Sequence, residues 1–308
     1  MIEAERGLKS ARDREPTVYW DRALGRRVTE KVYGNQWVQW LYGNPLGRLV
    51  ADQVLSAQWM SRLAGTYQSS KLSRSKIAPF IQDFQINMDE YEPGPFMSFN
   101  HFFIRKFKPG LRTFVQEPRL LPAFAEARYL AFEQVDPHQS FPVKGEHLSA
   151  ETVLGDLTTA RQFKGGSVLI ARLCPTDYHR FHFPDEGTLV SEKRVHGKFH
   201  SVNPLALSAK SEILASNERH VSIIDTKNFG KIAYVEVGAM CVGRIIHTHS
   251  WSRPFKRGEE KGFFLFGAST VILFGEPNRW KPDLDLVENT QRRLETFVRL
   301  GDRVAYVP

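Results

Sequence analysis

From Arg119 onward the chain consists of short apolar runs that glycine and proline separate. Such runs, bounded by turn residues, are typical of buried strands. No amphipathic helical pattern lies between consecutive runs, which favours an antiparallel sheet over a doubly wound parallel one. The predicted strands are 168–173, 188–195, 220–225, 232–237, 243–247 and 263–274, and Asn228-Phe229-Gly230 predicts a turn between two of them.

Residues 17 to 90 have a different texture, which predicts helices. Asn44-Pro45 places a capping side chain before a proline at the first helical position, where the missing N–H costs nothing. Apolar residues then recur every three or four positions as far as Leu63, which predicts an amphipathic helix over 44–63. A last helix is predicted over 284–300. The predicted fold class is therefore α+β, a helical N-terminal region followed by a mainly antiparallel β-sheet core.

We divide the chain into a helical region, residues 1–95, and a β-rich domain, residues 96–308, in which we expect the candidate catalytic residues. Trp37 and Trp40 precede the predicted amphipathic helix, and aromatic rings with one polar edge favour the headgroup zone of a bilayer. The helical region is therefore a candidate for membrane docking. The same apolar stripe could instead pack on the protein's own core.

The net charge and the two cysteines restrict which binding partners and which cellular compartment we expect. The 42 basic and 34 acidic side chains leave a formal charge of +8, which favours an anionic partner. The basic residues form no run long enough for a nucleic-acid arm, and their small clusters are typical of solvated faces. Cys174 and Cys241 have no disulfide or zinc spacing, so we expect a reducing compartment.

Targeting signals are not evident in the sequence. The longest apolar stretch, 263–274, is shorter than the roughly 18 residues that a transmembrane helix needs. The first fifteen residues are densely charged and have no apolar segment, which argues against a secretory signal peptide.

Histidines are the most numerous candidates for chemistry in the strand-rich half. They occur in the pairs His179/His182, His196/His200 and His247/His249. A pair of imidazoles can begin a metal site, but such sites usually include carboxylate or cysteine ligands as well, so we predict no metal. A Gly-x-Ser-x-Gly elbow, which an unrelated hydrolase would need, is also missing from the sequence.

A step of small residues, Gly267-Ala268-Ser269-Thr270, interrupts the apolar stretch over 262–274. A buried hydroxyl there must find a hydrogen-bond partner or cost about 1–3 kcal/mol. Small neighbours also let another backbone or a reacting group approach closely. On these residues alone, a bulge with a satisfied serine and a reactive serine both remain open.

Several blocks in collinear order resemble the phosphatidylserine decarboxylase family over roughly residues 95–275. Each block alone is weak evidence for the family, but their occurrence together in this order is specific. They are FNHFFIRKFKPGLR at 99–112, VKGEHLSAETVLG at 143–155, RLCPTDYHRFHFP at 172–184, the stretch 197–204, Asn-Glu-Arg at 217–219, VEVGAMCVGRI at 235–245 and KGFFLFGASTVILF at 261–274.

The resemblance implies a self-processing enzyme that makes its own cofactor. Cleavage between Ala268 and Ser269 would leave a β chain ending at 268 and an α chain, 269–308, that carries a pyruvoyl group derived from Ser269. The implied reaction converts phosphatidylserine to phosphatidylethanolamine and CO2 through a pyruvoyl Schiff base. Neither a metal nor a dissociable cofactor is implied.

The resemblance also implies roles for individual residues. His182 matches the base of a serine–histidine–acid relay, and His179 matches a histidine that handles substrate. The family's acid is an aspartate that this chain lacks, and Glu126 is the carboxylate in register with it. Alanine at 268 replaces the usual glycine. These two departures leave one alternative, an unprocessed and catalytically inactive lipid-binding relative.

The implied partners follow from the substrate. They are phosphatidylserine in an anionic membrane and the two cleaved chains themselves, with no nucleic acid and with a homodimer left open. The implied location is the cytoplasmic face of the cell membrane, with peripheral attachment.

Overall fold

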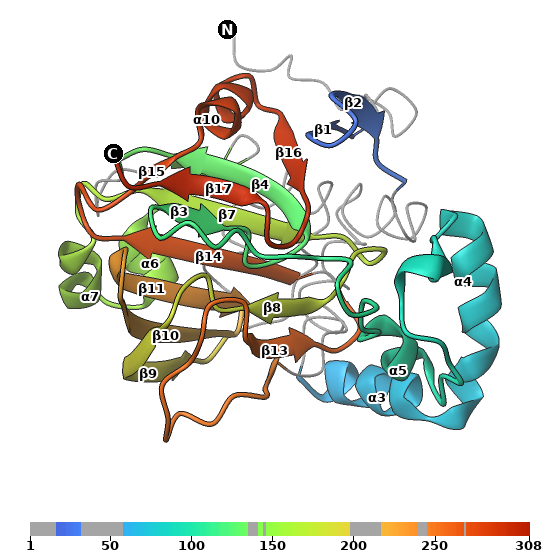
Figure 1. The fold of residues 1–308 in the computed structure, drawn as a ribbon. Helices are drawn as coiled ribbons and strands as arrows, with labels where there is room; N and C mark the ends of the chain where they lie inside the picture. Colours follow the sequence, from blue (N-terminus) through green and yellow to red (C-terminus); the bar gives the residue numbers. More distant parts are fainter. Residues whose placement is uncertain are drawn as a thin grey trace, which may run out of the picture.

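A computed structural model gives the fold of residues 17–31, 58–134, 141–143, 146–197, 217–238, 245–267 and 269–308 (Figure 1). Its largest sheet has nine strands among these residues, in the order β2-β1-β16-β4-β7-β14-β11-β10-β9. Neighbouring strands are antiparallel except for the parallel pair β1 and β16. In sheet order the strands are Arg26–Thr29, Val18–Asp21, Glu295–Val298, Ala127–Phe132, Val168–Leu173, Ser269–Gly275, Gly230–Val237, Arg219–Thr226 and Gly187–Val195.

Smaller sheets complete the β-rich part. One has the order β12-β13-β8, where β12 is Ile245–His247, β13 is Glu260–Phe264 and β8 is Arg180–His182. Its Phe181 and Phe264 belong to the same buried core as the large sheet. The remaining strands are β15 (Lys281–Pro282), β17 (Arg303–Tyr306) and β3 (Leu120–Pro122) in one sheet, and β5 (Phe141–Val143) and β6 (Glu146–Leu148) in another.

Helices gather mainly at one end of the sheets (Figure 1). We call residues 58–103 the helical lobe. It contains α3 (Gln58–Ser69), η2 (Lys71–Lys76), α4 (Ile77–Phe84), η3 (Met88–Glu90) and α5 (Phe99–Phe103), while α6 (Ala150–Leu154), α7 (Leu157–Gln162) and α10 (Leu284–Gln291) lie elsewhere. Within the described ranges, no helix has both the length and the apolar character needed to cross a membrane.

Strand β14 lies inside the large sheet and is buried along its whole length. All seven of its residues are buried, and it pairs with β7 on one side and β11 on the other. Both neighbours are also rich in buried Val, Ile and Leu, as expected for strands that are covered on both faces. The start of β14 is therefore held by strand pairing on both sides and by burial along the whole strand.

The predicted fold class is confirmed. Strand 168–173 has the predicted bounds, and β9, β10 and β11 extend their predictions by only one or two residues. The predicted turn at 228–230 is present, with Gly230 at a φ of 71° that glycine adopts more readily than other residues.

Three expectations about secondary structure were wrong. The stretch 263–274 forms two strands in different sheets, since β13 ends at Phe264 and β14 begins at Ser269. The helix predicted over 284–300 ends at Gln291, and β16 follows after Arg293, whose φ is 58°. Residues 18–29 form a hairpin instead of a helix, consistent with the β-branched and aromatic residues in its strands.

Part of the helical prediction lies outside the described residues. Helix α3 begins at Gln58, so most of the predicted helix over 44–63 is not covered, and neither are Trp37 and Trp40. The proposed division at residue 95 stays a prediction.

A buried ion pair joins the β12-β13-β8 sheet to the large sheet. Lys261 on β13 donates to Glu236 on β11, and both side chains are fully buried. Breaking such a pair by removing one partner leaves an uncompensated charge in the core. We expect Lys261→Met to lower the free energy of unfolding by about 3–5 kcal/mol, measured by urea denaturation.

Replacing both partners provides the control for this prediction. Lys261→Met combined with Glu236→Leu leaves no buried charge, so the double variant should lose much less stability than either single variant. Equal losses in the single and double variants would contradict this account.

Candidate active site

Ser269 is the first residue of β14 and is fully buried. It pairs with Leu173 of β7, and Val271, two residues later on the same face, pairs with Glu236 of β11. Thr270 points to the other face, and its buried hydroxyl has no hydrogen-bond partner among the described residues. The two neighbouring hydroxyls therefore have different surroundings.

His179 is the side chain that meets Ser269. Its Nδ1 atom lies 3.1 Å from the Ser269 hydroxyl, and its Nε2 atom lies 2.7 Å from the carbonyl oxygen of Cys174. A carbonyl oxygen only accepts, so Nε2 carries the ring proton when the imidazole is neutral. Nδ1 is then free of hydrogen and accepts the hydrogen bond from Ser269, as a general base must.

Burial keeps His179 neutral. Loss of hydration lowers its pKa to about 3, the Cys174 carbonyl acts in the opposite direction, and the Arg105 guanidinium lowers the pKa further. The ring of Phe103 stacks on the imidazole with ring centres 3.9 Å apart. Near neutral pH the ring is therefore unprotonated and able to take a proton from Ser269.

His182 lies in a separate set of contacts. Its Nδ1 atom donates to the Gly258 carbonyl at 2.9 Å, and its Nε2 atom accepts from the Tyr178 hydroxyl at 3.2 Å. Burial lowers its pKa to about 4, so it too is neutral near pH 7. Both ring nitrogens are occupied, and in the part of the chain that the structure describes neither bonds to Ser269.

Glu126 is buried but does not bond to either histidine. Its carboxylate accepts two hydrogen bonds from Arg112, at 2.6 and 2.9 Å, and one from the Leu300 backbone N–H at 3.1 Å. The relay predicted from the sequence, Ser269–His182–Glu126, is thus not joined by hydrogen bonds in the described residues. The geometry brings His179 to Ser269 in place of His182.

The segment before Ser269 is held by the helical lobe. The Asn100 side chain accepts a hydrogen bond from the Phe266 backbone N–H at 2.8 Å, and its amide donates to the Ser69 hydroxyl at 2.9 Å. The Phe266 ring packs edge-on against Phe99 and Phe103. The FNHFF block thus acts as a clamp on the residues that lead into Ser269, a contact that the sequence pattern alone did not reveal.

Gly267 supplies the backbone conformation at this point. Its φ is 148°, a value that residues with a Cβ rarely adopt. Ala268 lies outside the described residues. The conformation that requires glycine therefore falls on Gly267, which the chain retains, although position 268 carries alanine.

The other histidine pairs have local roles. His249 contacts Glu259 at 3.1 Å, and His247 lies 3.7 Å from the buried Glu236. His200 is not among the described residues. Across the described ranges, no three side chains of His, Cys, Asp or Glu come together as a metal site would require.

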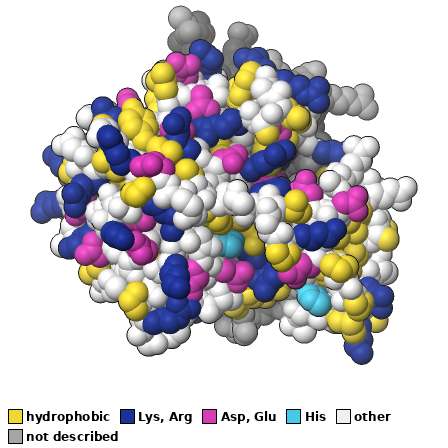
Figure 2. Space-filling model, in the orientation of Figure 1, with side chains coloured by type: hydrophobic (Ala, Val, Ile, Leu, Met, Phe, Trp, Pro, Cys, Tyr) yellow, Lys and Arg dark blue, Asp and Glu magenta, His cyan; other side chains and the backbone are white. Residues whose placement is uncertain are grey.

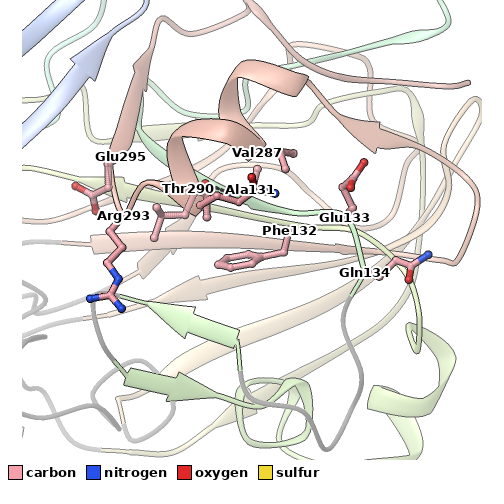
Figure 3. A pocket seen from close by; sticks show the side chains of 10 residues that line it. Ala131, Phe132, Glu133, Gln134, Val287, Thr290, Arg293 and Glu295 are labelled. Carbon is pink, nitrogen blue, oxygen red and sulfur yellow. Dashed lines mark hydrogen bonds between the residues drawn. The ribbon is translucent and has the colours of Figure 1, made fainter.

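A pocket of about 460 Å³ lies away from Ser269, between β4, α10 and β16 (Figure 3). The close-up shows Phe132, Glu133 and Arg293 among its labelled lining residues. Strand register puts Leu130, which lines it, on the opposite face of the large sheet from Ser269. None of Ser269, His179 and His182 contributes to its wall, so the pocket is separate from the site.

Comparison with known proteins identifies the family. The sequence profile of the family described as phosphatidylserine decarboxylase matches residues 99–306. The chain belongs to the phosphatidylserine decarboxylase family. This confirms the resemblance seen in the sequence blocks and makes the chain a decarboxylase, a lyase.

Curated relatives agree over most of their length. A protein of Clostridium perfringens is 41% identical over 282 residues, which is 89% of this chain and 94% of its own. Proteins of Clostridium tetani and Desulfitobacterium hafniense are each 40% identical over 288 residues, 93% of this chain and 97% of theirs. Each is named phosphatidylserine decarboxylase proenzyme, so the alternative of an inactive lipid-binding relative is not favoured.

Proposed function

We propose that this chain is a proenzyme that cleaves itself between Ala268 and Ser269 and then decarboxylates phosphatidylserine with a pyruvoyl group formed from Ser269. The observation that carries the proposal is the 3.1 Å contact between the Ser269 hydroxyl and His179 Nδ1 in a fully buried site. Family membership supports the substrate, since the relatives named above are called phosphatidylserine decarboxylase proenzymes.

Self-cleavage begins with proton transfer from Ser269 to His179 Nδ1. The serine oxygen attacks the carbonyl carbon of residue 268, and the protonated imidazole returns the proton to the departing backbone nitrogen of Ser269. An ester replaces the amide bond. Loss of the Ser269 α-proton and of the ester oxygen then releases residue 268 as a carboxylate, and water exchanges the nitrogen of the remaining enamine for oxygen as ammonia leaves.

The surroundings of Ser269 fit a carbonyl group that reacts with an amine. The start of β14 is buried and His179 is neutral, and burial limits the access of bulk water to a reactive ketone. Once formed, the pyruvoyl carbonyl supplies the electron sink that loss of CO2 requires. We assign to His179 the proton-accepting role in cleavage that the sequence predicted for His182. The role of Glu126 in a relay stays a prediction.

Two readouts on one preparation test this function. Denaturing electrophoresis should show a large and a small chain, and vesicles containing carboxyl-labelled phosphatidylserine should release labelled CO2. A single chain of 35.3 kDa that binds the vesicles without releasing CO2 would instead indicate the inactive relative.

We further propose that the helical lobe meets an anionic bilayer peripherally. Leu63 on α3 and Leu72 on η2 are 60% and 76% exposed, and η2 also carries Lys71 and Arg74. Figure 2 shows hydrophobic side chains interspersed with Lys and Arg at the lower right, where Figure 1 places this lobe. Apolar side chains next to basic ones suit the boundary between anionic headgroups and acyl chains.

Charged substitutions on the lobe test the membrane contact. Leu63→Asp with Leu72→Asp should reduce co-sedimentation with phosphatidylserine vesicles by at least tenfold, because apolar burial and charge attraction are both lost. The matched control is Leu284→Asp, at a 69% exposed leucine on α10, away from the lobe. Equal sedimentation of all three proteins would place the docking surface elsewhere.

A further inference from the structure

A second pocket, of about 270 Å³, lies where the helical lobe meets β8. The segments 92–96 and 104–106 line it together with Arg180 of β8, whose Nε donates to the Ile104 carbonyl at 2.8 Å. Pockets for drug-sized ligands usually measure roughly 300–1,000 Å³. This smaller pocket therefore suits a small ligand, or one group of a larger ligand.

Basic side chains dominate this pocket. Three of them line it, Arg105, Lys106 and Arg180, and Glu92 is the one acidic residue among the lining residues. Arg180 has a partner, because its Nη1 donates to Glu260 at 2.7 Å. Lys106 is exposed and forms no ion pair within the described ranges. The pocket thus has positive charge that the described residues leave unbalanced.

Arg105 is the side chain in this pocket that most needs an anion. It is 2% exposed, and its Nη2 donates to the Thr176 carbonyl at 2.7 Å, but Nε and Nη1 have no acceptor among the described residues. The rings of Tyr91 and Phe102 lie against it, with centres 4.3 and 4.8 Å from the guanidinium carbon. Buried N–H groups rarely lack partners, and a buried charge without a counter-charge is costly. An oxyanion in the pocket would supply both.

The pocket adjoins the candidate active site. Arg180, which lines the pocket, directly follows His179, which contacts Ser269. Arg105 holds the same segment through its hydrogen bond to the Thr176 carbonyl. One short segment, 176–180, therefore contacts both the pocket and Ser269.

Phosphatidylserine has two anionic groups, and only one of them suits such a pocket. Its carboxylate loses its charge as CO2 leaves, so a cation beside it would stabilise the starting state more than the transition state and slow the reaction. The phosphate diester keeps its charge throughout. The planar guanidinium of arginine also matches the geometry of phosphate oxygens. The chemistry thus favours the phosphate.

We propose that this pocket is a phosphate-binding site, with the buried Arg105 and the exposed Lys106 as its cations, and that it holds the headgroup phosphate of the phospholipid substrate. The assignment to the headgroup rests on the proposed function. Phosphate binding itself does not, because it needs no reaction at Ser269.

The chain offers a matched pair of surface lysines for the test. Lys106 and Lys108 are both exposed, but only Lys106 lines the pocket. Lys106→Glu reverses a charge in the pocket, and Lys108→Glu makes the same change in net charge outside it. Arg105→Met removes the buried cation and keeps a long side chain. Should that buried substitution prevent folding, the two surface variants still decide the question.

Binding is measured on the full chain that carries Ser269→Ala, by calorimetric titration with inorganic phosphate at constant ionic strength. We expect Lys106→Glu to raise the Kd about tenfold and Arg105→Met to raise it about 10- to 100-fold, the scale of lost charge-assisted hydrogen bonds. Lys108→Glu should stay within about twofold, because screening weakens the effect of an exposed charge outside the site. No phosphate binding by the parent chain, or an equal loss in Lys108→Glu, would overturn the site.

Competition identifies the source of the phosphate. Glycerophosphoserine, which has the diester, should displace inorganic phosphate from the Ser269→Ala chain, whereas O-methylserine, which has none, should not. In the processed protein, Lys106→Glu should raise the KM for monomeric short-chain phosphatidylserine about tenfold and leave kcat unchanged, because uniform binding of the phosphate is lost. Lys108→Glu should leave both constants unchanged.

Failures of the two proposals are distinguishable. If glycerophosphoserine and inorganic phosphate bind together without competing, the pocket holds a free phosphate and the headgroup assignment is wrong. A fall in kcat at constant KM would also contradict that assignment. If the protein releases no CO2 from phosphatidylserine, the proposed function fails, while the phosphate titration of the Ser269→Ala chain still decides whether the pocket binds phosphate.

Discussion

We expect Ser269→Ala to remain one chain of about 35.3 kDa and to release no CO2 from phosphatidylserine. Self-cleavage needs the side-chain oxygen of Ser269, which first attacks the carbonyl of residue 268 and is later eliminated. The methyl group of alanine offers no such nucleophile. Ser269 is buried beside His179, and alanine is smaller than serine, so it fits the same space. The variant protein should therefore fold normally. The measurement is denaturing electrophoresis combined with release of labelled CO2.

Thr270→Ala is the matched control for this variant. Thr270 is the next residue on the same strand, but it points to the other face, and its hydroxyl has no partner among the described residues. We expect two chains and retained CO2 release. Cleavage of Ser269→Ala, or an intact Thr270→Ala chain, would show that the wrong hydroxyl had been chosen.

The second large effect separates the two histidines. His179→Ala should slow self-cleavage by roughly 10²- to 10⁴-fold, the usual contribution of a positioned general base. His182→Ala should stay within about tenfold of the unsubstituted chain, because a group outside hydrogen-bond reach takes no direct part in proton transfer and its lost contacts are to Tyr178 and Gly258. Time courses during cell-free synthesis give both rates.

The reverse result has a clear meaning. If His182→Ala blocks cleavage while His179→Ala is cut normally, the relay predicted from the sequence is right, and the contact between His179 and Ser269 does not describe the reacting state. Loss of cleavage in both variants would contradict the assignment of proton transfer to His179 alone.

Local sequence patterns predicted the sheet better than its boundaries. The run 168–173 is uniformly apolar and forms a strand with those bounds. The run 263–274 is nearly as apolar, yet it divides between two sheets, with β13 ending at Phe264 and β14 beginning at Ser269. Hydrophobicity predicts which residues are buried, but it does not predict which sheet a buried strand joins.

Near the C-terminus, strand pairing shortens the helix that the sequence pattern predicts. The periodic stretch over 284–300 begins as α10, but β16 pairs with β1 and β4 at Glu295–Val298. The pairing with β1 joins segments almost 280 positions apart, and no local pattern contains that information. The same contact explains why residues 18–21 form a strand.

At the site, the sequence singled out Ser269 and the short segment that contains the histidine in contact with it. Spacing could not choose between His179 and His182, since residues three apart near a strand point to opposite sides and only the packed neighbour decides. The hydrogen bond from His179 to the Cys174 carbonyl could not be predicted from side-chain motifs, because every residue has a backbone carbonyl. Asp177 lies in the same sequence block, but its contact with Arg128 of β4 depends on the fold.

Intact-mass analysis of the purified protein tests the central claim most directly. The account predicts two masses, one for residues 1–268 and one for residues 269–308 that is lighter by one ammonia than the peptide with an ordinary N-terminal serine. A single mass for the full chain, from a preparation that still releases CO2 from phosphatidylserine, would contradict it.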